Sequence, residues 1–402
     1  MKFKKWAFYL GMFFCQSGFA FEIMHDLSFN EERIFKNLIS TYNLENKTNI
    51  QLKRIQSPND VGVLNILSAP DAVFLNPKKY QALYKMMAAA KKPLSIKLLP
   101  FLKHGNLDKR GNVVALPLFY STPVLFLNKE SFLKAKLKNF QAPQTWQDLQ
   151  ELLGLLQDSG VRCPYTSTWP AWIHLDNTST LLGESTMDAR GQLRINTLNQ
   201  LRHIALMRTW QQAEFYWSYG AGNDALREFY NGKCAVLSSD ASAYGTLKNS
   251  HVALDFLPLP HHKNNMRGFT LAHGAALWAG ATKSKKDLSA AAAFVHYLTL
   301  PQTQVFLTQN AATLPFTESG KQLALKELPV SDKTLLQMEL KHLKAASTLR
   351  LGKITALRQI MDEELFAIWQ GKKTAKAGLD SAVQRGNALL RNKAAFKKEQ
   401  PF

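Results

Sequence analysis

The chain has 402 residues, of which 46% are hydrophobic and 20% charged. This composition excludes wholesale disorder and leaves room for two or three domain-sized cores. The formal net charge of +20 makes nucleic acid, anionic membranes and anionic ligands candidate partners. The lysines are scattered in pairs such as Lys78-Lys79 and Lys372-Lys373, and no nucleic-acid-binding motif occurs. We therefore expect no nucleic-acid partner, and a solvated basic surface that at most steers anionic solutes.

Residues 1–20 have the pattern of a secretory signal peptide. Three lysines fall within the first five residues, Trp6–Cys15 is a short apolar core, and Gly18-Phe19-Ala20 supplies small residues at positions −3 and −1. The apolar core is too short to span a bilayer, and no later segment is long and apolar enough to do so. The sequence predicts cleavage before Phe21 and an exported, soluble mature chain.

Two cysteines, Cys163 and Cys234, lie beyond this segment. Export makes a disulfide between them chemically feasible, but the sequence alone does not pair two thiols that are a whole region apart. The bridged and the free forms both stay open. Neither cysteine lies in a CxxC motif or beside a histidine, so neither indicates a metal site or a nucleophile.

The first part of the chain alternates strands and helices. Strands are predicted over 21–23, 50–55 and 71–75, and helices over 30–42, 60–67 and 81–90. Within the first helix Ile34, Leu38 and Tyr42 recur at the spacing of one buried face. Alternation at this spacing is typical of βαβ units, and it predicts an α/β fold with a mostly parallel sheet.

The stretch 111–129, GNVVALPLFYSTPVLFLNK, contains two apolar, β-rich runs separated by Tyr120-Ser121-Thr122. Runs this apolar are typical of strands that are covered on both faces. We interpret the polar break as a hinge at which the chain leaves one sheet and enters another, with Ser121 at the mouth of a cleft. Two buried strands joined by an ordinary turn are the alternative.

A helix is predicted to follow Thr145, which serves as its N-cap with Asp148 three residues on. In the stretch Cys163–Asp176, CPYTSTWPAWIHLD, Trp169 and Trp172 are predicted to lie in a loop rich in proline and threonine. Large aromatic side chains in loops often line ligand sites. They also anchor loops onto a core, and the local pattern leaves both interpretations open.

The remaining elements complete an α/β plan. A buried strand over 234–238 runs into the polar turn Ser239–Ser242, and 274–279 is a candidate second return between the sheets. Helices are predicted over 199–210, 224–230, 288–300 and 301–309, and through most of the last third of the chain. His261, His262 and His273 lack the spacing and the carboxylate partners of a metal site, so no metal is expected.

No enzyme signature occurs in the sequence. It lacks a GxSxG elbow, HExxH, a Walker loop and a GxGxxG after a strand. Adjacent carboxylates such as Glu363 and Glu364 point apart on a helix and more often solvate its surface. We therefore expect no catalysis and no cofactor. Ligand clefts favour domain junctions, so a binding function is favoured.

Several sequence blocks occur in a fixed order between residues 111 and 390. They are LPLFYSTPVLFLNKESF, PQTW, the segment from Cys163 to Asn177, FYNGKCAV, GAALW, TLPFT, LRLGK, DEELFAIWQGKKT and AVQRGNALLR. In this order they resemble the family 1 extracellular solute-binding proteins of ABC importers, and within that family its glycerol-3-phosphate-binding members. The resemblance implies a periplasmic-binding-protein type II fold, like that of maltose-binding protein, whose two lobes close on a ligand by hinge motion.

The resemblance also implies partners and domains. Permease subunits in the inner membrane would be the protein partners, and the binding protein would be a monomer. After the signal peptide at 1–20, lobe 1 is expected to comprise 21–120 plus 275–325. Lobe 2 is expected to comprise 121–274 plus 326–402.

Site residues carry over from the family one at a time. Ser121 matches a ligand-contacting serine, and Trp169 and Trp172 match two aromatic wall residues. Gly274 matches a glycine whose backbone amide faces the ligand, and Arg350 matches the arginine that pairs with phosphate. A guanidinium suits phosphate because it can bind two oxygens at once.

Three positions depart from the family pattern. The glutamate that binds the glycerol hydroxyls falls near Asn76-Pro77, and the tyrosine before Leu-Pro is Thr313. A phosphate-side serine aligns with Asp240, or with Ser239 if the turn is shifted by one residue. An aspartate beside a phosphate would repel it. Together with the tryptophans it would attract a cationic headgroup such as choline.

Three functions remain in view. The first is an importer-associated receptor for glycerol-3-phosphate or a glycerophosphodiester, for example glycerophosphocholine. The second is an oligosaccharide receptor of the same fold that uses the tryptophans as stacking platforms. The third is a secreted enzyme or adhesin with a basic surface.

Overall fold

The computed structural model describes residues 20–57, 59–68, 78–103, 105–137, 140–263, 268–281, 284–343 and 354–391. The predicted signal peptide lies outside these residues except for Ala20. The predicted strand at 71–75, Asn76-Pro77 and Arg350 also lie outside them.

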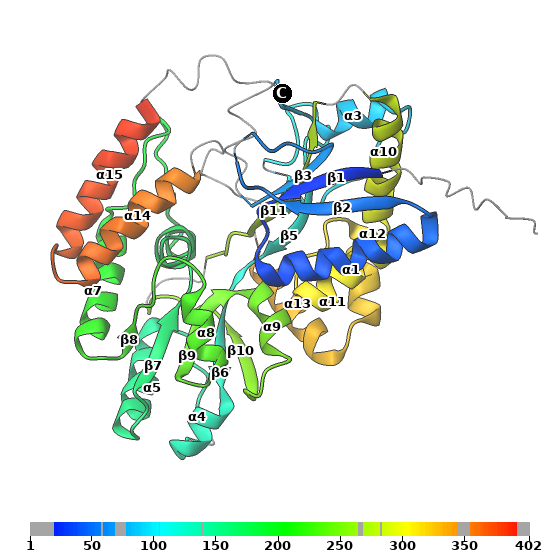
Figure 1. Ribbon diagram of the computed structural model, residues 1–402. Coiled ribbons are helices and arrows are strands. Elements are labelled where there is room, and N and C mark those ends of the chain that lie inside the picture. Colours follow the sequence, from blue (N-terminus) through cyan, green and yellow to red (C-terminus); the bar gives the residue numbers. More distant parts are fainter. Residues whose placement is uncertain are drawn as a thin grey trace, which may run out of the picture.

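Two β-sheets organise the molecule (Figure 1). The first contains β1 (Ala20–His25), β2 (Asn49–Arg54), β3 (Leu64–Leu67), β4 (Tyr80–Gln81), β5 (Leu116–Ser121) and β11 (His273–Gly280). Its order is β2-β1-β3-β11-β4, and β5 also pairs with β11. The second contains β6 (Pro123–Asn128), β7 (Cys163–Ser167), β8 (Tyr216–Trp217), β9 (Cys234–Asp240) and β10 (Leu254–Pro258), in the order β10-β6-β9-β7-β8.

Helices surround both sheets. They are α1 (Phe29–Asn46), α3 (Leu83–Ala89), α4 (Lys129–Lys134), α5 (Trp146–Asp158), α6 (Thr178–Leu181), α7 (Leu198–Gln212), α8 (Asp224–Tyr230), α9 (Tyr244–Leu247), α10 (Lys285–Thr299), α11 (Pro301–Ala311), α12 (Glu318–Glu327), α13 (Val330–His342), α14 (Ile354–Trp369) and α15 (Ala375–Arg391). A π-helix covers Ala171–Asn177. Helix α5 begins as predicted, because Thr145 and Asp148 form a complete capping box.

Each sheet has its own hydrophobic core. Phe35 of α1 and Phe294 of α10 pack with Phe119 against the first sheet. Trp146 of α5 and Met361 of α14 belong to the core beneath the second sheet. Helices α14, α15 and α7 pack side by side over that second core (Figure 1). Two cores joined by few chain crossings are what a two-lobed protein requires.

Two of the sequence-based predictions about this region are wrong. The segment 60–67 was expected to be helical, but its second half is strand β3, which is buried along its whole length. These four buried residues lie between β1 and β11, so strand partners on both sides supply the hydrogen bonds that their backbone N–H and C=O groups require. The sheets are also mixed rather than mostly parallel, because β11 runs antiparallel to β3, β4 and β5.

The predicted crossover between the sheets is confirmed. Strand β5 ends at Ser121 in the first sheet and β6 begins at Pro123 in the second, so Thr122 alone separates them. The second return is confirmed as well, because β11 of the first sheet is the strand that follows β10 of the second.

The two cysteines form a disulfide. Cys163 of β7 lies opposite Cys234 of β9 in the parallel pairing of these strands, and their Cα atoms are 4.5 Å apart. This decides between the two forms that the sequence left open.

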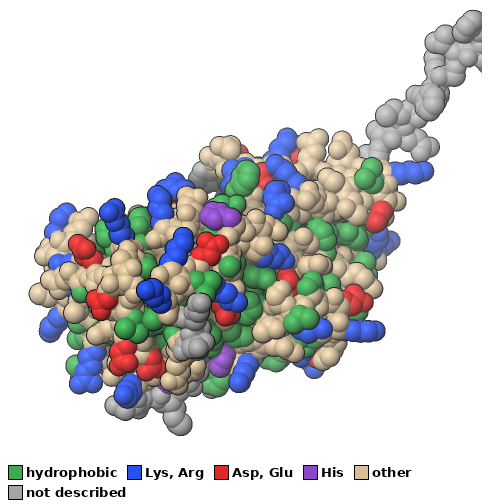
Figure 2. Space-filling model, turned by 90° about the horizontal axis from the view of Figure 1, so that it is seen from below, with side chains coloured by type: hydrophobic (Ala, Val, Ile, Leu, Met, Phe, Trp, Pro, Cys, Tyr) green, Lys and Arg blue, Asp and Glu red, His purple; other side chains and the backbone are tan. Residues whose placement is uncertain are grey.

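The surface is basic without a single dense patch on the face seen in Figure 2. Lysine and arginine side chains are spread over that face and alternate with carboxylates. This distribution agrees with a solvated basic surface.

Candidate functional site

The crossover between the sheets is fixed by hydrogen bonds from distant parts of the chain. The backbone N–H and the hydroxyl of Thr122 both donate to Oε1 of Glu339 in α13, at 2.9 and 3.1 Å. The carbonyl of Thr122 accepts from Ala241 N at 2.8 Å, and the carbonyl of Tyr120 accepts from Leu314 N at 2.7 Å. Residues from four parts of the sequence therefore meet at one point.

Four of the predicted site residues lie around this point. Ser121 is paired with His273, and Gly274 lies opposite Tyr120 in the β5–β11 pairing. Asp240 lies opposite Pro123 at the start of β6. Thr313 precedes the Leu314 amide that binds Tyr120, and its side chain is buried.

Gly274 cannot be replaced without moving backbone. A Cβ atom at this position would lie 1.8 Å from the carbonyl oxygen of Phe119. The close approach of β5 and β11 beside the crossover therefore requires glycine.

Trp169 and Asp240 are joined by a hydrogen bond that the sequence did not predict. The indole Nε1–H of Trp169 donates to Oδ2 of Asp240 at 3.2 Å, and the other carboxylate oxygen accepts from the hydroxyl of Ser242. Trp169 is 41% exposed and has a φ of 47°. A left-handed backbone is costly for a bulky residue and occurs most often at functional sites.

Trp172 differs from Trp169 in being only 4% exposed. It lies in the π-helix, and its ring centroid is 6.1 Å from that of His273. Its indole N–H is buried and has no hydrogen-bond partner among the described residues. The two interpretations thus divide between the residues: Trp169 presents a ring to solvent, whereas Trp172 is packed inside. The predicted loop is corrected at Trp172, which lies in the π-helix and whose indole N–H no described residue accepts.

Carboxylates that the sequence analysis missed face the same region. Burial raises the pKa of Glu31 in the first turn of α1 to about 7, and the charges of Asp240 and Asp26 add to this rise. Burial likewise raises the pKa of Glu339 to about 8, against the hydrogen bonds from Thr122. Only the Ser28-x-x-Glu31 capping box was visible in the sequence as a local signal. The charge of Asp240 raises the pKa of both Glu31 and Glu339, and it does so only because the fold brings these distant residues together.

Among the described residues, no group of three or more histidine, cysteine, aspartate or glutamate side chains is arranged to hold a metal ion. Three histidines do associate, but as a hydrogen-bonded chain: His174 Nδ1 is 3.1 Å from His203 Nε2, and His203 Nδ1 is 3.1 Å from His262 Nε2. Rings linked directly to one another leave no shared space for an ion.

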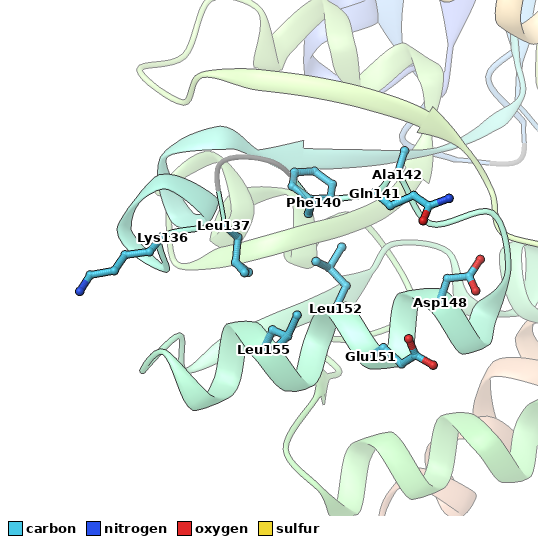
Figure 3. Close-up of a pocket in the computed structure, with 9 residues that line it drawn as sticks. All are labelled: Lys136, Leu137, Phe140, Gln141, Ala142, Asp148, Glu151, Leu152 and Leu155. Carbon is cyan, nitrogen blue, oxygen red and sulfur yellow. The ribbon is translucent and has the colours of Figure 1, made fainter.

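A groove of about 570 Å³ lies elsewhere, between α5 and the segment after α4. Leu152 and Leu155 of α5 line one side and Leu137 and Phe140 the other, while the Lys136 side chain points away (Figure 3). None of the predicted site residues lines it, so it is separate from the crossover site.

Comparison with known proteins places the chain in a family. The sequence model for bacterial extracellular solute-binding proteins matches residues 42–333. The chain belongs to this family of solute-binding proteins. Its relatives are solute-binding proteins rather than enzymes.

This solute-binding protein is 29% identical over 383 residues to the sn-glycerol-3-phosphate-binding periplasmic protein UgpB of Escherichia coli K12, covering 90% of the chain and 87% of that relative. Its fold is similar to that of maltose-bound MalE3 from T. maritima, with a TM-score of 0.75 and 15% identity over 92% of this chain and 99% of that one. UgpB from Mycobacterium tuberculosis in complex with glycerophosphocholine gives a TM-score of 0.74 and 17% identity over 93% and 98%.

These structures confirm the predicted two-lobed, maltose-binding-protein-like fold. The family match and the likeness to UgpB in sequence make the chain a solute-binding protein of the ABC-importer type, a class that takes a small-molecule ligand and works with permease partners. Within the described parts of the chain, no helix is both long and apolar enough to cross a membrane.

Proposed function

We propose that this protein is the periplasmic receptor of an ABC importer for glycerol-3-phosphate or a glycerophosphodiester such as glycerophosphocholine. The observation that carries the proposal is the convergence of Ser121, Trp169, Asp240 and Gly274 at the crossover between the two sheets. Likeness over nine-tenths of the chain to a periplasmic protein that binds glycerol-3-phosphate supports the ligand class.

In this proposal each site residue has a chemical role. The Ser121 hydroxyl and the Gly274 amide donate to phosphate oxygens, and Arg350 neutralises the phosphate charge. Trp172 contributes its indole N–H, and Thr313 stands where relatives of the family place a tyrosine. Trp169 and Asp240 together present an aromatic face and a carboxylate, which suits a cationic headgroup on the far side of a phosphodiester.

The proposal extends to export and assembly. The mature protein is released by cleavage of the signal peptide at 1–20, remains a monomer and delivers its ligand to permease subunits in the inner membrane. Lobe 1 comprises 21–120 plus 275–325, and lobe 2 comprises 121–274 plus 326–402.

Calorimetric titration of the mature protein with glycerol-3-phosphate, glycerophosphocholine and maltose tests the ligand class. We expect heat of binding with at least one phosphoester and none with the sugar. The Arg350→Ala variant should weaken phosphoester binding by about 10- to 100-fold, the value of a charge-assisted hydrogen-bonded pair. The Arg190→Ala variant, at an exposed arginine, is the control and should bind as the unchanged protein does.

An oligosaccharide is the second candidate ligand, favoured by the exposed ring of Trp169, because a bare indole face stacks on a sugar. The same experiment separates the two. Binding of the sugar without any phosphoester heat, together with an Arg350→Ala variant that binds it unchanged, would replace the phosphoester proposal by this one.

A further inference from the structure

One helix holds the π-helix of Trp172 at both ends. At the start, the backbone N–H of Ala171 donates to Oδ1 of Asp362 at 2.9 Å. Near the end, Nε and Nη2 of Arg358 both lie 2.8 Å from Oδ2 of Asp176. Arg358 and Asp362 are four residues apart on α14, so they project from the same side of that helix.

The ion pair at the second contact is buried. Asp176 is 0% exposed, and its Oδ1 has no hydrogen-bond partner in the described part of the chain. Burial raises the pKa of Asp176, against the lowering effect of Arg358. The free-energy cost of desolvating two charges offsets most of their Coulomb attraction, so a buried ion pair adds little net stability. Its main effect here is to hold the π-helix in one position relative to α14.

The π-helix in turn sets the position of the aromatic wall. Asn177, its last residue, donates to the Trp172 carbonyl at 3.1 Å and accepts from Leu271 N at 2.7 Å. The Trp172 ring packs on His273, the neighbour of Gly274. The pKa of His273 is lowered first by burial and then by the positive charge of Arg358. The Arg358 guanidinium is therefore close enough to act electrostatically on the ring against which Trp172 packs. Single-turn π-helices often occur at functional sites.

We propose that Arg358 and Asp362 are positioning residues for ligand binding: by clamping both ends of the π-helix they hold Trp172 against His273, the chain neighbour of Gly274. The effect on affinity rests on the proposed function, whereas the clamp itself does not. Burial raises the pKa of Asp362 to about 7, opposed by the Ala171 hydrogen bond and by Arg358. Its neutral form is therefore well populated near pH 7, which makes asparagine a conservative substitute.

Hydrogen exchange of the ligand-free protein tests the clamp. In the Asp362→Ala and Arg358→Met variants we expect exchange of the backbone amides at 171–177 to become about tenfold faster, the loss of roughly one hydrogen bond. The Asp362→Asn variant keeps an acceptor for Ala171 and should exchange like the unchanged protein. If Arg358→Met fails to fold because Asp176 is left unpaired, the Ala and Asn variants at 362 still decide the question.

A matched control lies on the same helix. Glu364 of α14 is buried, more so than the half-buried Arg358 and Asp362, and it accepts from Arg385 Nη1 of α15 at 2.8 Å. The Arg385→Met variant should lower the melting temperature without changing exchange at 171–177.

Affinity is the second measurement. Titration with glycerophosphocholine and glycerol-3-phosphate should show about tenfold weaker binding for Asp362→Ala, with Asp362→Asn and Arg385→Met unchanged. Unaltered exchange at 171–177 in Asp362→Ala, or equal losses in the Arg385→Met control, would overturn the clamp. If the unchanged protein binds neither phosphoester, the proposed function fails, and the exchange measurement still decides on the clamp.

Discussion

Glu339 closes the crossover, since it accepts hydrogen bonds from both the backbone N–H and the hydroxyl of Thr122. It is 3% exposed, and burial raises its pKa to about 8. At neutral pH the group is therefore mostly protonated, and its ionisation would place a charge inside the point where the two sheets meet.

The free energy of unfolding should depend on pH through this residue. Between its ordinary value of 4.5 and about 8, the folded protein keeps a proton that the unfolded chain has lost. Raising the pH across this window therefore lowers the free energy of unfolding, by at most about 1.4 kcal/mol per pH unit for one proton. Urea midpoints at pH 5 and pH 8 measure the effect.

The Glu339→Gln variant is the control, because it keeps an acceptor for Thr122 and does not titrate. Glu31, whose pKa is also raised, contributes in the same direction in both proteins and cancels in the comparison. An equal pH dependence in the two proteins would show that Glu339 does not titrate in this window.

Asp240 should decide the choice between the two phosphoesters. Replacing it by asparagine keeps an acceptor for Trp169 and removes one charge from the site. We expect Asp240→Asn to bind glycerol-3-phosphate more tightly and glycerophosphocholine more weakly, each by about three- to tenfold, because a partly solvated charge contributes about 1 kcal/mol. Titrations with both ligands at two salt concentrations check this.

Asp255→Asn, which removes an exposed carboxylate on β10 paired with Lys129, should leave both affinities unchanged. Shifts of the same sign for both ligands in Asp240→Asn would mean that Asp240 shapes the site without selecting the headgroup.

Individual site residues could be predicted from the sequence where they lie in a motif, but not where they act through a contact with a distant part of the chain. Ser121 lies in a recognisable polar break, and Gly274 in a block shared with a family. Glu339 contacts Thr122 across 217 positions, and the Trp169–Asp240 bond spans 71. No local sequence pattern indicates either contact, because each forms only when distant segments are brought together by the packing of the two sheets. The position of Arg350 in the site stays a prediction.

Among the elements, the central strands β7 and β9 are joined covalently as well as by hydrogen bonds. The Cys163–Cys234 disulfide spans 71 residues and is buried. In the chain-entropy model, a closed loop of this length lowers the entropy of the unfolded chain and so raises its free energy by roughly 3–5 kcal/mol. Reduction should therefore lower the free energy of unfolding by up to that amount.

Urea denaturation with and without a phosphine reductant measures this effect. The Cys163→Ala, Cys234→Ala double variant should match the reduced protein and should not respond to the reductant. A midpoint that reduction leaves unchanged would contradict the expected stabilisation.

Elements were predictable where their pattern is local. The capping box fixed the start of α5, and the two apolar runs fixed β5 and β6. Strand β3 was missed because four buried residues have no period to distinguish a strand from a turn of helix. The antiparallel course of β11 was missed because it depends on a return from the second sheet, about 150 residues after β5.

For the whole molecule, the described residues join the two cores through Thr122 and through the chain that leads from β10 to β11. We expect these connections to act as a hinge of the kind that closes around ligands. We expect the radius of gyration in solution to fall when glycerol-3-phosphate or glycerophosphocholine, whichever binds, is added to saturation. A ligand that binds only the folded protein should also raise the free energy of unfolding by about 2.7 kcal/mol at one hundred times its dissociation constant.

Small-angle scattering and thermal denaturation on the same samples measure both effects, with maltose as the non-binding comparison. Closure requires contacts from both sheets, so the Trp169→Ala variant, which loses one wall of the site, should need more ligand for the same compaction. Stabilisation without compaction would mean that the ligand binds to one sheet alone. In that case the residues gathered at the crossover would form a site on a rigid scaffold, and hinge closure would not contribute to its affinity.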